Sequence, residues 1–283
     1  MEEHARAGPQ ARLRRGLGAA RVVHPFPSLL VTGLTVALVP LAGGSPGAGR
    51  YLALGGAMLC FQFAIGLVND VADAPSDAVN KPWKPIPAGI VRRDAAVGAA
   101  VALIAAGVLV SMSLPFAAWL IGLAGLGCGL AYDLWLKRTV LSWLPYAMAL
   151  PLLPAWVFVA AGAWDRFLGW VFPLGMVLGL ALHLANQAPD ETADARAGIT
   201  SAVQLLGERH SRAIATALFG VAASLAVIVV GHEERSRAAV AGLLAAAVLA
   251  LAPWSSRWFG RDGLFGLLAV GSAGLAVVFL SVA

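Results

Sequence analysis

Carboxylate and amide side chains recur at a spacing of four residues in two places, each at the end of a long apolar run. The first acidic motif, within NDVADAPSD, comprises Asn69, Asp70, Asp73 and Asp77. The second acidic motif, within NQAPDETAD, comprises Asn186, Asp190 and Asp194. Residues at positions i, i+4 and i+8 lie on roughly one face of a helix. We therefore expect each motif to present its oxygen atoms together.

Oxygen atoms grouped in this way are typical of a site for a hard divalent cation. Mg²⁺ is commonly shared between one or two carboxylates and a substrate phosphate. If the two motifs face each other, they can hold two or three Mg²⁺ ions and a diphosphate. The expected metal ligands are Asn69, Asp70, Asp73, Asp77, Asp190 and Asp194, and the last four aspartates are the expected catalytic carboxylates. The alternative is that these acids are solvated loop residues at helix ends.

Basic and amide side chains near the two motifs could bind the phosphate groups. The expected diphosphate-binding residues are Asn69, Lys81, Lys84, Lys137, Arg138, Asn186 and Arg196. Cations beside a metal-bound diphosphate can stabilise the charge of the leaving group. The alternative for each cation is that it marks only the cytoplasmic side of a membrane protein.

A polar stripe leads from each motif back into its apolar run. Gln62 lies seven residues before Asn69, and His183 lies three before Asn186. Polar residues inside a membrane-spanning helix face a bundle interior or a cavity rather than lipid. We therefore expect Gln62 and His183 to line a cavity.

The composition excludes a water-soluble protein. Of the 283 residues, 59% are hydrophobic and only 12% are charged, whereas soluble domains carry about 25% charged residues. The isoelectric point near 9.8 does not indicate a nucleic-acid partner, because the basic residues lie in the loops between apolar runs. Residues 1–20 are polar and lack the apolar core of a signal peptide.

Nine apolar runs are long enough to cross a bilayer, which takes about 20 residues per helix. They cover residues 27–45, 50–69, 95–113, 115–132, 141–161, 168–188, 212–230, 237–253 and 264–282. Backbone groups in lipid must be satisfied within their own segment, so the runs are expected to be helices. The predicted fold is all-α: a basic cytoplasmic arm (1–22) and a single transmembrane domain (23–283). Glycines at small-xxx-small spacing, Gly125/Gly129 and Gly175/Gly179, indicate close helix packing.

The distribution of Lys and Arg predicts the orientation. With the N-terminus in the cytoplasm, sixteen of the twenty basic residues fall on the cytoplasmic side, as the positive-inside rule requires. Both acidic motifs then lie at the cytoplasmic face of a multi-pass protein of the cell (inner) membrane.

The residues of the two motifs resemble those of the UbiA superfamily of intramembrane prenyltransferases. NDVADAPSD with KPIPAG (84–89) is similar to the family's first motif, and Asp190 to Ser201 to its second. The segment YDLWLKRT (132–139) resembles the family's loop between a tyrosine and a basic residue, and RVVHPFPSLL (21–30) its first helix. Lys84 replaces a commoner arginine, and Asp133 replaces a small polar residue.

The resemblance implies a nine-helix bundle around a central cavity, with Mg²⁺ and a polyprenyl diphosphate at the cytoplasmic mouth. It implies transfer of the prenyl group to a lipophilic acceptor. Tyr132 could stabilise the allylic cation through its ring, and Asp133 could take a proton from the acceptor. The alternative for Asp133 is an ion pair with Lys137.

Two other functions remain open from the sequence. An intramembrane terpene cyclase would use the same diphosphate site with an internal double bond as the nucleophile. An ion-coupled transporter would use the acids as ion sites, but it predicts charged residues near the middle of the membrane. The sequence leaves the acceptor, the length of the prenyl chain and the oligomeric state open.

Overall fold

A computed structural model describes residues 21–43, 47–196 and 198–282, without the side chains of Ala193 and Asp194. The predicted arm therefore lies almost entirely outside the described residues. Within the described ranges every regular element is helical, and nine helical segments are long and apolar enough to cross a membrane. These segments are Pro25–Ala42, Ala48–Asn80, Arg93–Ser111, Phe116–Leu134, Leu144–Ala161, Phe167–Asp190, Glu208–Glu233, Arg235–Phe259 and Gly263–Leu280. The all-α prediction and the nine spans are confirmed.

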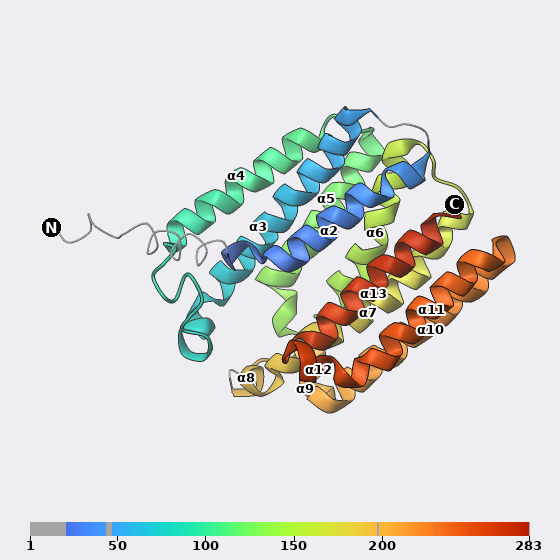
Figure 1. Ribbon diagram of the computed structural model, residues 1–283. Coiled ribbons are helices and arrows are strands. Elements are labelled where there is room, and N and C mark those ends of the chain that lie inside the picture. The colour runs from blue at the N-terminus through green and yellow to red at the C-terminus, as the bar shows by residue number, and fades with distance from the viewer. Residues whose placement is uncertain (1–20, 44–46, 197, 283) are drawn as a thin grey trace, which may run out of the picture.

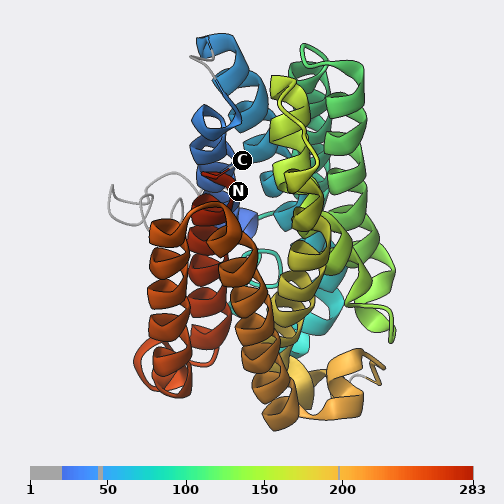
Figure 2. The same ribbon diagram turned by 90° about the vertical axis from the view of Figure 1, so that its right-hand side faces the viewer.

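The long helices run side by side and form one bundle (Figure 1). They are α2 (Pro25–Leu38), α3 (Ala48–Asn80), α4 (Arg93–Ser111), α5 (Phe116–Leu134), α6 (Leu144–Ala161), α7 (Val171–Gln187), α10 (Glu208–Glu233), α11 (Arg235–Leu251) and α13 (Gly263–Leu280). Figure 2 shows α10, α11 and α13 on one side of the bundle and α4 and α5 on the other. Neighbours in the chain pack together, and α13 also packs against α2, α7, α10 and α11.

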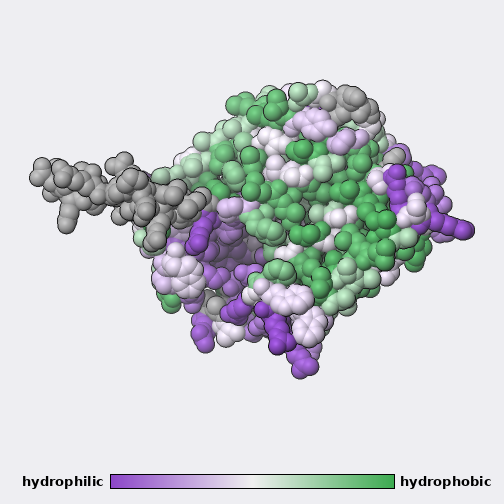
Figure 3. Space-filling model, in the orientation of Figure 1, coloured by the Kyte–Doolittle hydropathy of each residue, from purple (hydrophilic) through white to green (hydrophobic). Residues whose placement is uncertain are grey.

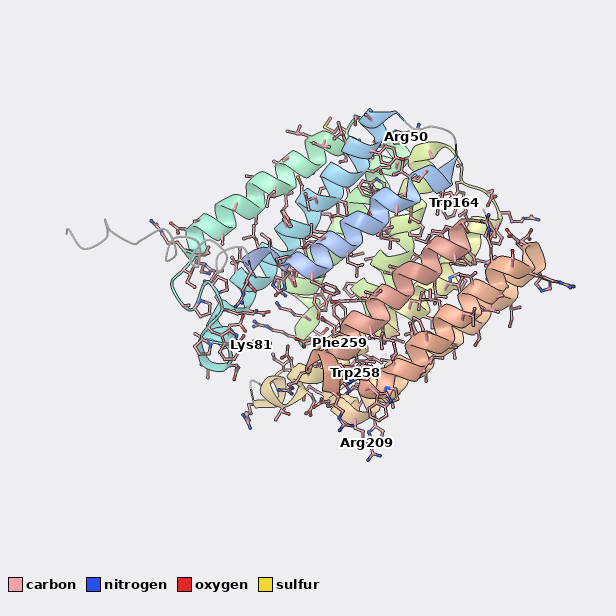
Figure 4. All side chains as sticks on the ribbon, viewed as in Figure 1. Arg50, Lys81, Trp164, Arg209, Trp258 and Phe259 are labelled. Atoms are coloured by element: carbon pink, nitrogen blue, oxygen red, sulfur yellow. The ribbon has the colours of Figure 1, made fainter. Side chains whose placement is uncertain are left out.

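Short elements gather at the end of the bundle where α3 and α7 finish (Figure 1). They are η3 (Leu136–Arg138), η5 (Ala188–Asp190), α8 (Glu191–Arg196), α9 (Ala202–Leu206) and α12 (Ser255–Phe259). At this end lie Lys81, Arg209 and Trp258, whereas Arg50 and Trp164 lie at the other (Figure 4). The basic loops identified in the sequence therefore share one end of the molecule.

The two acidic motifs differ in their local structure. Helix α3 continues for 33 residues through Pro75 to Asn80, so the first motif lies on one unbroken helix. Helix α7 ends at Gln187, and a 3-10 turn that includes Pro189 separates it from α8. The prediction of one continuous helix face for Asn186, Asp190 and Asp194 is wrong. Proline lacks the amide hydrogen and interferes with the preceding turn, so the α-helix stops before it.

Glycines allow close contact between helices at three of the four predicted positions. A Cβ atom at Gly179 would lie 2.3 Å from the backbone oxygen of Tyr146, and one at Gly175 would lie 2.9 Å from Pro151. At Gly129 it would lie 2.4 Å from Ile65. Gly125 is different, because no atom lies within 4 Å of its Cβ position. Its missing side chain leaves open space instead of a helix contact.

Candidate active site

A single cavity of about 650 Å³ runs from the polar end of the bundle far into its apolar interior. Figure 3 shows a hydrophilic hollow at this end, bordered by the apolar surface of the helices. Residues of both acidic motifs line it: Asn69, Asp73, Asp77, Asn186 and Asp190. Asp133, Lys81, Lys84, Lys137 and Arg138 line it as well. The structure thus brings residues that are more than 100 positions apart into one mouth.

Two lysines bind the carboxylates that face this mouth. Lys137 Nζ lies 2.7 Å from Asp73 Oδ1, and Arg138 Nη2 lies 3.8 Å from the same oxygen. Lys81 Nζ donates to both oxygens of Asp190, at 2.8 and 2.9 Å. Because Lys81 directly follows α3, the latter pair joins the first acidic motif to the second.

Lys84 bridges the two remaining aspartates of the first motif. Its Nζ lies 2.9 Å from Asp70 Oδ1 and 2.8 Å from Asp77 Oδ2. Burial lowers the pKa of Lys84, but the hydrogen bond and charge of Asp77 and the charge of Asp70 more than reverse this and raise it. Lys84 therefore stays protonated at neutral pH.

Asp70 is placed differently from the other acids of the motif. Only 3% of its side chain is exposed, and it does not line the cavity. Besides Lys84, its Oδ1 contacts Nε2 of His24 at 3.0 Å. His24 has a φ of 47°, an uncommon backbone conformation for a residue other than glycine. In this arrangement Asp70 fixes Lys84 and the start of α2 and does not face the expected metal position.

Polar side chains below the carboxylates form a second layer of the site. Asn69 Nδ2 donates to Asp133 Oδ1 at 2.8 Å. Lys137 lies 3.9 Å from the same oxygen, farther than it lies from Asp73. The ion pair of Asp133 with Lys137 that the sequence allowed is therefore present, although Lys137 lies closer to Asp73. Asp133 is almost fully buried and receives its hydrogen bond from Asn69.

Two tyrosines meet in the cavity wall at this depth. The rings of Tyr132 and Tyr146 make an edge-to-face contact with centroids 5.2 Å apart. Gln187 donates to the Tyr132 hydroxyl at 3.1 Å, and Asn186 donates to the Tyr146 hydroxyl at 3.0 Å. Amides at the end of α7 thus orient both phenol rings, which can face a developing cation.

His183 does not line the cavity, contrary to the prediction, whereas Gln62 does. His183 is fully buried. Its Nε2 lies 3.1 Å from the Ser142 hydroxyl, and its ring packs on both tyrosines. The histidine therefore supports the tyrosines from behind.

One further predicted residue does not contribute to the described mouth. Arg196 is exposed at the end of α8 and does not line the cavity. The side chain of Asp194 lies outside the described residues.

Four residues that line the cavity were not predicted from the sequence: His24, Tyr146, Gln187 and Asp262. Gln187 also orients Tyr132. Gln187 and His24 lie within segments already singled out, NQAPD and RVVHPFP, so their position was a usable signal. Tyr146 and Asp262 stand alone in the sequence, and only the fold brings them to the cavity.

The donor atoms of the mouth fit a hard cation that is shared with a ligand. Among the residues with described side chains, no three His, Cys, Asp or Glu groups lie close enough to hold one ion. The carboxylates instead stand singly or in pairs, with lysines between them. That arrangement suits Mg²⁺ completed by phosphate oxygens, which takes one or two carboxylates from the protein.

Residues 29–263 match the model of the UbiA prenyltransferase family. A digeranylgeranylglyceryl phosphate synthase of Methanoculleus marisnigri is 30% identical over 167 residues, which cover 56% of this chain and 58% of that protein. Another, from Korarchaeum cryptofilum, is 42% identical over 72 residues, 25% of this chain and 26% of its own. The chain therefore spans less than two thirds of the length of these curated relatives.

Solved structures share the fold. A UbiA homologue from Archaeoglobus fulgidus bound to GPP and Mg²⁺ superposes with a TM-score of 0.70 at 19% identity, covering 92% of this chain and 99% of that one. A UbiA homologue from Aeropyrum pernix gives 0.68 at 20% identity, covering 89% and 96%. Nine apolar helices within the described ranges, together with the family match, identify a multi-pass membrane protein.

Proposed function

We propose that this chain, which belongs to the UbiA prenyltransferase family, is a Mg²⁺-dependent intramembrane enzyme that transfers a prenyl group from a prenyl diphosphate to a lipophilic acceptor. The observation that carries the proposal is that Asp73 and Asp190, from two distant motifs, line one polar mouth above one apolar cavity. Its catalytic domain covers residues 23–283.

The mouth provides separate positions for metal and phosphate. Asp73, Asp77 and Asp190, with the amide of Asn69, would hold Mg²⁺ through oxygen atoms. When bound, the metal would draw negative charge from the diphosphate. Lys81, Lys84, Lys137 and Arg138 would bind the phosphate oxygens as their carboxylate partners turn to the metal. A metal role for Asp70 and phosphate binding by Asn186 and Arg196 have less support from the described contacts, and a metal role for Asp194 stays a prediction.

The proposed reaction is an alkylation of the acceptor by the prenyl group of the donor. The allylic C–O bond of the donor breaks, and its electron pair leaves with the diphosphate. The acceptor contributes the electron pair of the new bond to C1 and loses a proton, which Asp133, a buried carboxylate that lines the cavity, would accept. Tyr132 and Tyr146 face the cation, and the apolar cavity keeps water from capturing it.

The names of the relatives indicate which class of acceptor to assay first. Two curated relatives are named for a glyceryl phosphate product, and the four cations at this mouth could also accommodate an acceptor phosphate. We therefore place a prenylated glycerol phosphate acceptor ahead of aromatic acceptors. We also propose that the N-terminus and this mouth face the cytoplasm, because the basic loops lie at the same end of the bundle as the mouth.

The test is release of diphosphate by the purified protein. We expect release from a prenyl diphosphate when Mg²⁺ and an acceptor are present, loss with EDTA, and recovery with added Mg²⁺. Formation of cyclic hydrocarbons in the absence of an acceptor would show that the enzyme is a terpene cyclase and not a transferase. No release with any donor would remove the proposal.

A further inference from the structure

The backbone on both sides of Asp190 is held by side chains from other parts of the chain. Arg261, in the turn between α12 and α13, donates from Nη2 to the backbone oxygen of Pro189. Gln204 of α9 donates from Nε2 to the backbone oxygen of Glu191 at 2.6 Å. The two residues that flank this cavity-lining carboxylate are thus each bound through their carbonyl groups.

Arg261 is itself anchored to the start of α10. Its backbone oxygen accepts a hydrogen bond from Nη1 of Arg212 at 3.4 Å. Its guanidinium lies 4.0 Å from Oε2 of Glu208. Asp262, the next residue, lines the cavity. The turn that contains Arg261 therefore belongs to the cavity wall and also supports the second acidic motif.

Gln204 is fixed by the first turn of α9. Its backbone amide donates to the hydroxyl of Ser201 at 3.4 Å, which caps this helix. Ser201 and Val203 are both buried, with 0% and 1% of their surface exposed. The short helix is therefore seated on the bundle, and Gln204 has a fixed base from which to bind the carbonyl group of Glu191.

The first acidic motif is positioned in a different way. Asp73 lies on the 33-residue helix α3, in which each backbone amide binds the carbonyl group four residues earlier. In the second motif, α7 ends at Gln187, and Pro189 has no amide hydrogen to continue the helix. One continuous helix therefore cannot set the position of Asp190, and side chains can satisfy and fix the backbone there instead.

We infer that Arg261 and Gln204 are positioning residues for Asp190, which hold the backbone around its 3-10 turn so that the carboxylate faces the metal and the diphosphate. The inference rests on the proposed function, because it requires that Asp190 binds Mg²⁺. Neither Arg261 nor Gln204 lines the cavity, so both act through the backbone and not on the ligand. The Arg261 side chain is 69% exposed, so its removal leaves no cavity in the bundle.

The first test measures how much Mg²⁺ is needed for binding of an unreactive prenyl S-thiolodiphosphate to the purified protein. Arg261→Ala should raise the Mg²⁺ concentration for half-maximal binding roughly tenfold, because the hydrogen bond that it removes has a charged donor. Gln204→Met, which loses a neutral donor of similar length, should raise it about threefold. Arg261→Lys should recover most of the loss, since lysine keeps a charged donor.

The matched control is Arg257→Ala. Arg257 is an exposed arginine of α12 whose guanidinium lies 5.5 Å from the ring of Trp254. This variant should need the same Mg²⁺ concentration as wild type. An equal rise in Arg257→Ala and Arg261→Ala would overturn the inference, because the effect would then come from the loss of any surface charge at this end.

The second test needs neither metal nor ligand. Hydrogen exchange compares residues 188–196, which include η5 and α8, with residues 69–80 at the end of α3. In Arg261→Ala the amides of 188–196 should exchange several-fold faster than in wild type, because their local opening becomes easier. The amides of 69–80 should exchange as in wild type.

The outcomes separate this inference from the proposed function. An unchanged Mg²⁺ requirement in both Arg261→Ala and Gln204→Met would overturn the inference alone. Faster exchange to the same extent over residues 69–80 would also overturn it, because the fold would then be loosened as a whole. Absence of Mg²⁺-dependent binding and of diphosphate release in wild type would instead remove the proposed function.

Discussion

The two acidic motifs have the same spacing in the sequence but unlike structures. The first lies on one continuous helix, and its Asp70 and Asp77 are less than one tenth exposed and share Lys84. The second is divided by a 3-10 turn at Pro189, and the Asp190 side chain remains 43% exposed beside Lys81. The comparison distinguishes a buried half of the site, in which one lysine bridges two carboxylates, from a half that presents its carboxylate to solvent.

The largest expected effect is on turnover when either half loses a carboxylate at the mouth. Asp73→Asn and Asp190→Asn should each lower kcat by roughly 10²–10³-fold, the usual cost of one preorganised electrostatic contact. Both proteins should insert and purify as wild type does, because neither carboxylate is fully buried. Diphosphate release at saturating Mg²⁺ measures this, and full activity in either variant would remove that motif from the site.

The next effect separates the two halves by stability. Lys84→Met should lower the free energy of unfolding by about 3 kcal/mol, because it leaves buried carboxylates without their shared partner. Lys81→Met is the matched control and should cost less than about 1 kcal/mol, since its pair is solvent-exposed. Thermal unfolding in detergent compares the two. Equal losses would mean that burial does not distinguish the ion pairs of the two halves.

The pH dependence of that difference follows from the pKa of Lys84. Its carboxylate partners raise this pKa in the folded state, so the stabilisation is complete below the unfolded pKa and is lost as pH rises through the folded one. The gap in melting temperature between wild type and Lys84→Met should stay constant from neutral pH to about pH 10 and shrink above it. A gap that already shrinks between pH 6 and 8 would point to another group.

The smallest effect concerns the break in the second motif. Pro189→Ala restores an amide that can continue α7, which would turn Asp190 away from Lys81. We expect a several-fold rise in the Mg²⁺ concentration needed for half-maximal turnover, with little change in melting temperature. Titration of Mg²⁺ against diphosphate release measures it. An unchanged requirement would show that the turn at Pro189 does not matter for Asp190.

Most of the fold could be predicted because each apolar run must form its own helix in lipid, and runs of about 20 residues are hard to misassign. The end of α3 was harder. The apolar run stops near Asn69, yet the helix continues through Pro75 to Asn80. The division of the second motif at Pro189 shows the opposite outcome for the same residue type, and local sequence does not separate the two cases.

The site could be predicted only in part, although the predicted uncharged residues Gln62 and Tyr132 do line the cavity. Regular spacing identified Asp73, Asp77 and Asp190, but it could not show that Asp70 faces Lys84 and His24 instead of the cavity. The roles of Tyr146 and Gln187, and the support that His183 gives to the tyrosines, depend on contacts between helices that are distant in the chain. Such contacts have no periodic signal in one sequence.

The central claim is that Asp73 and Asp190 act together on one metal-bound diphosphate. A double-mutant cycle of Mg²⁺-dependent binding of an unreactive prenyl S-thiolodiphosphate, using Asp73→Asn, Asp190→Asn and both, tests it most directly. The account predicts that each single variant loses most of the binding and that the double variant loses clearly less than the sum of the two. Losses that simply add, or binding that survives either substitution, would contradict it.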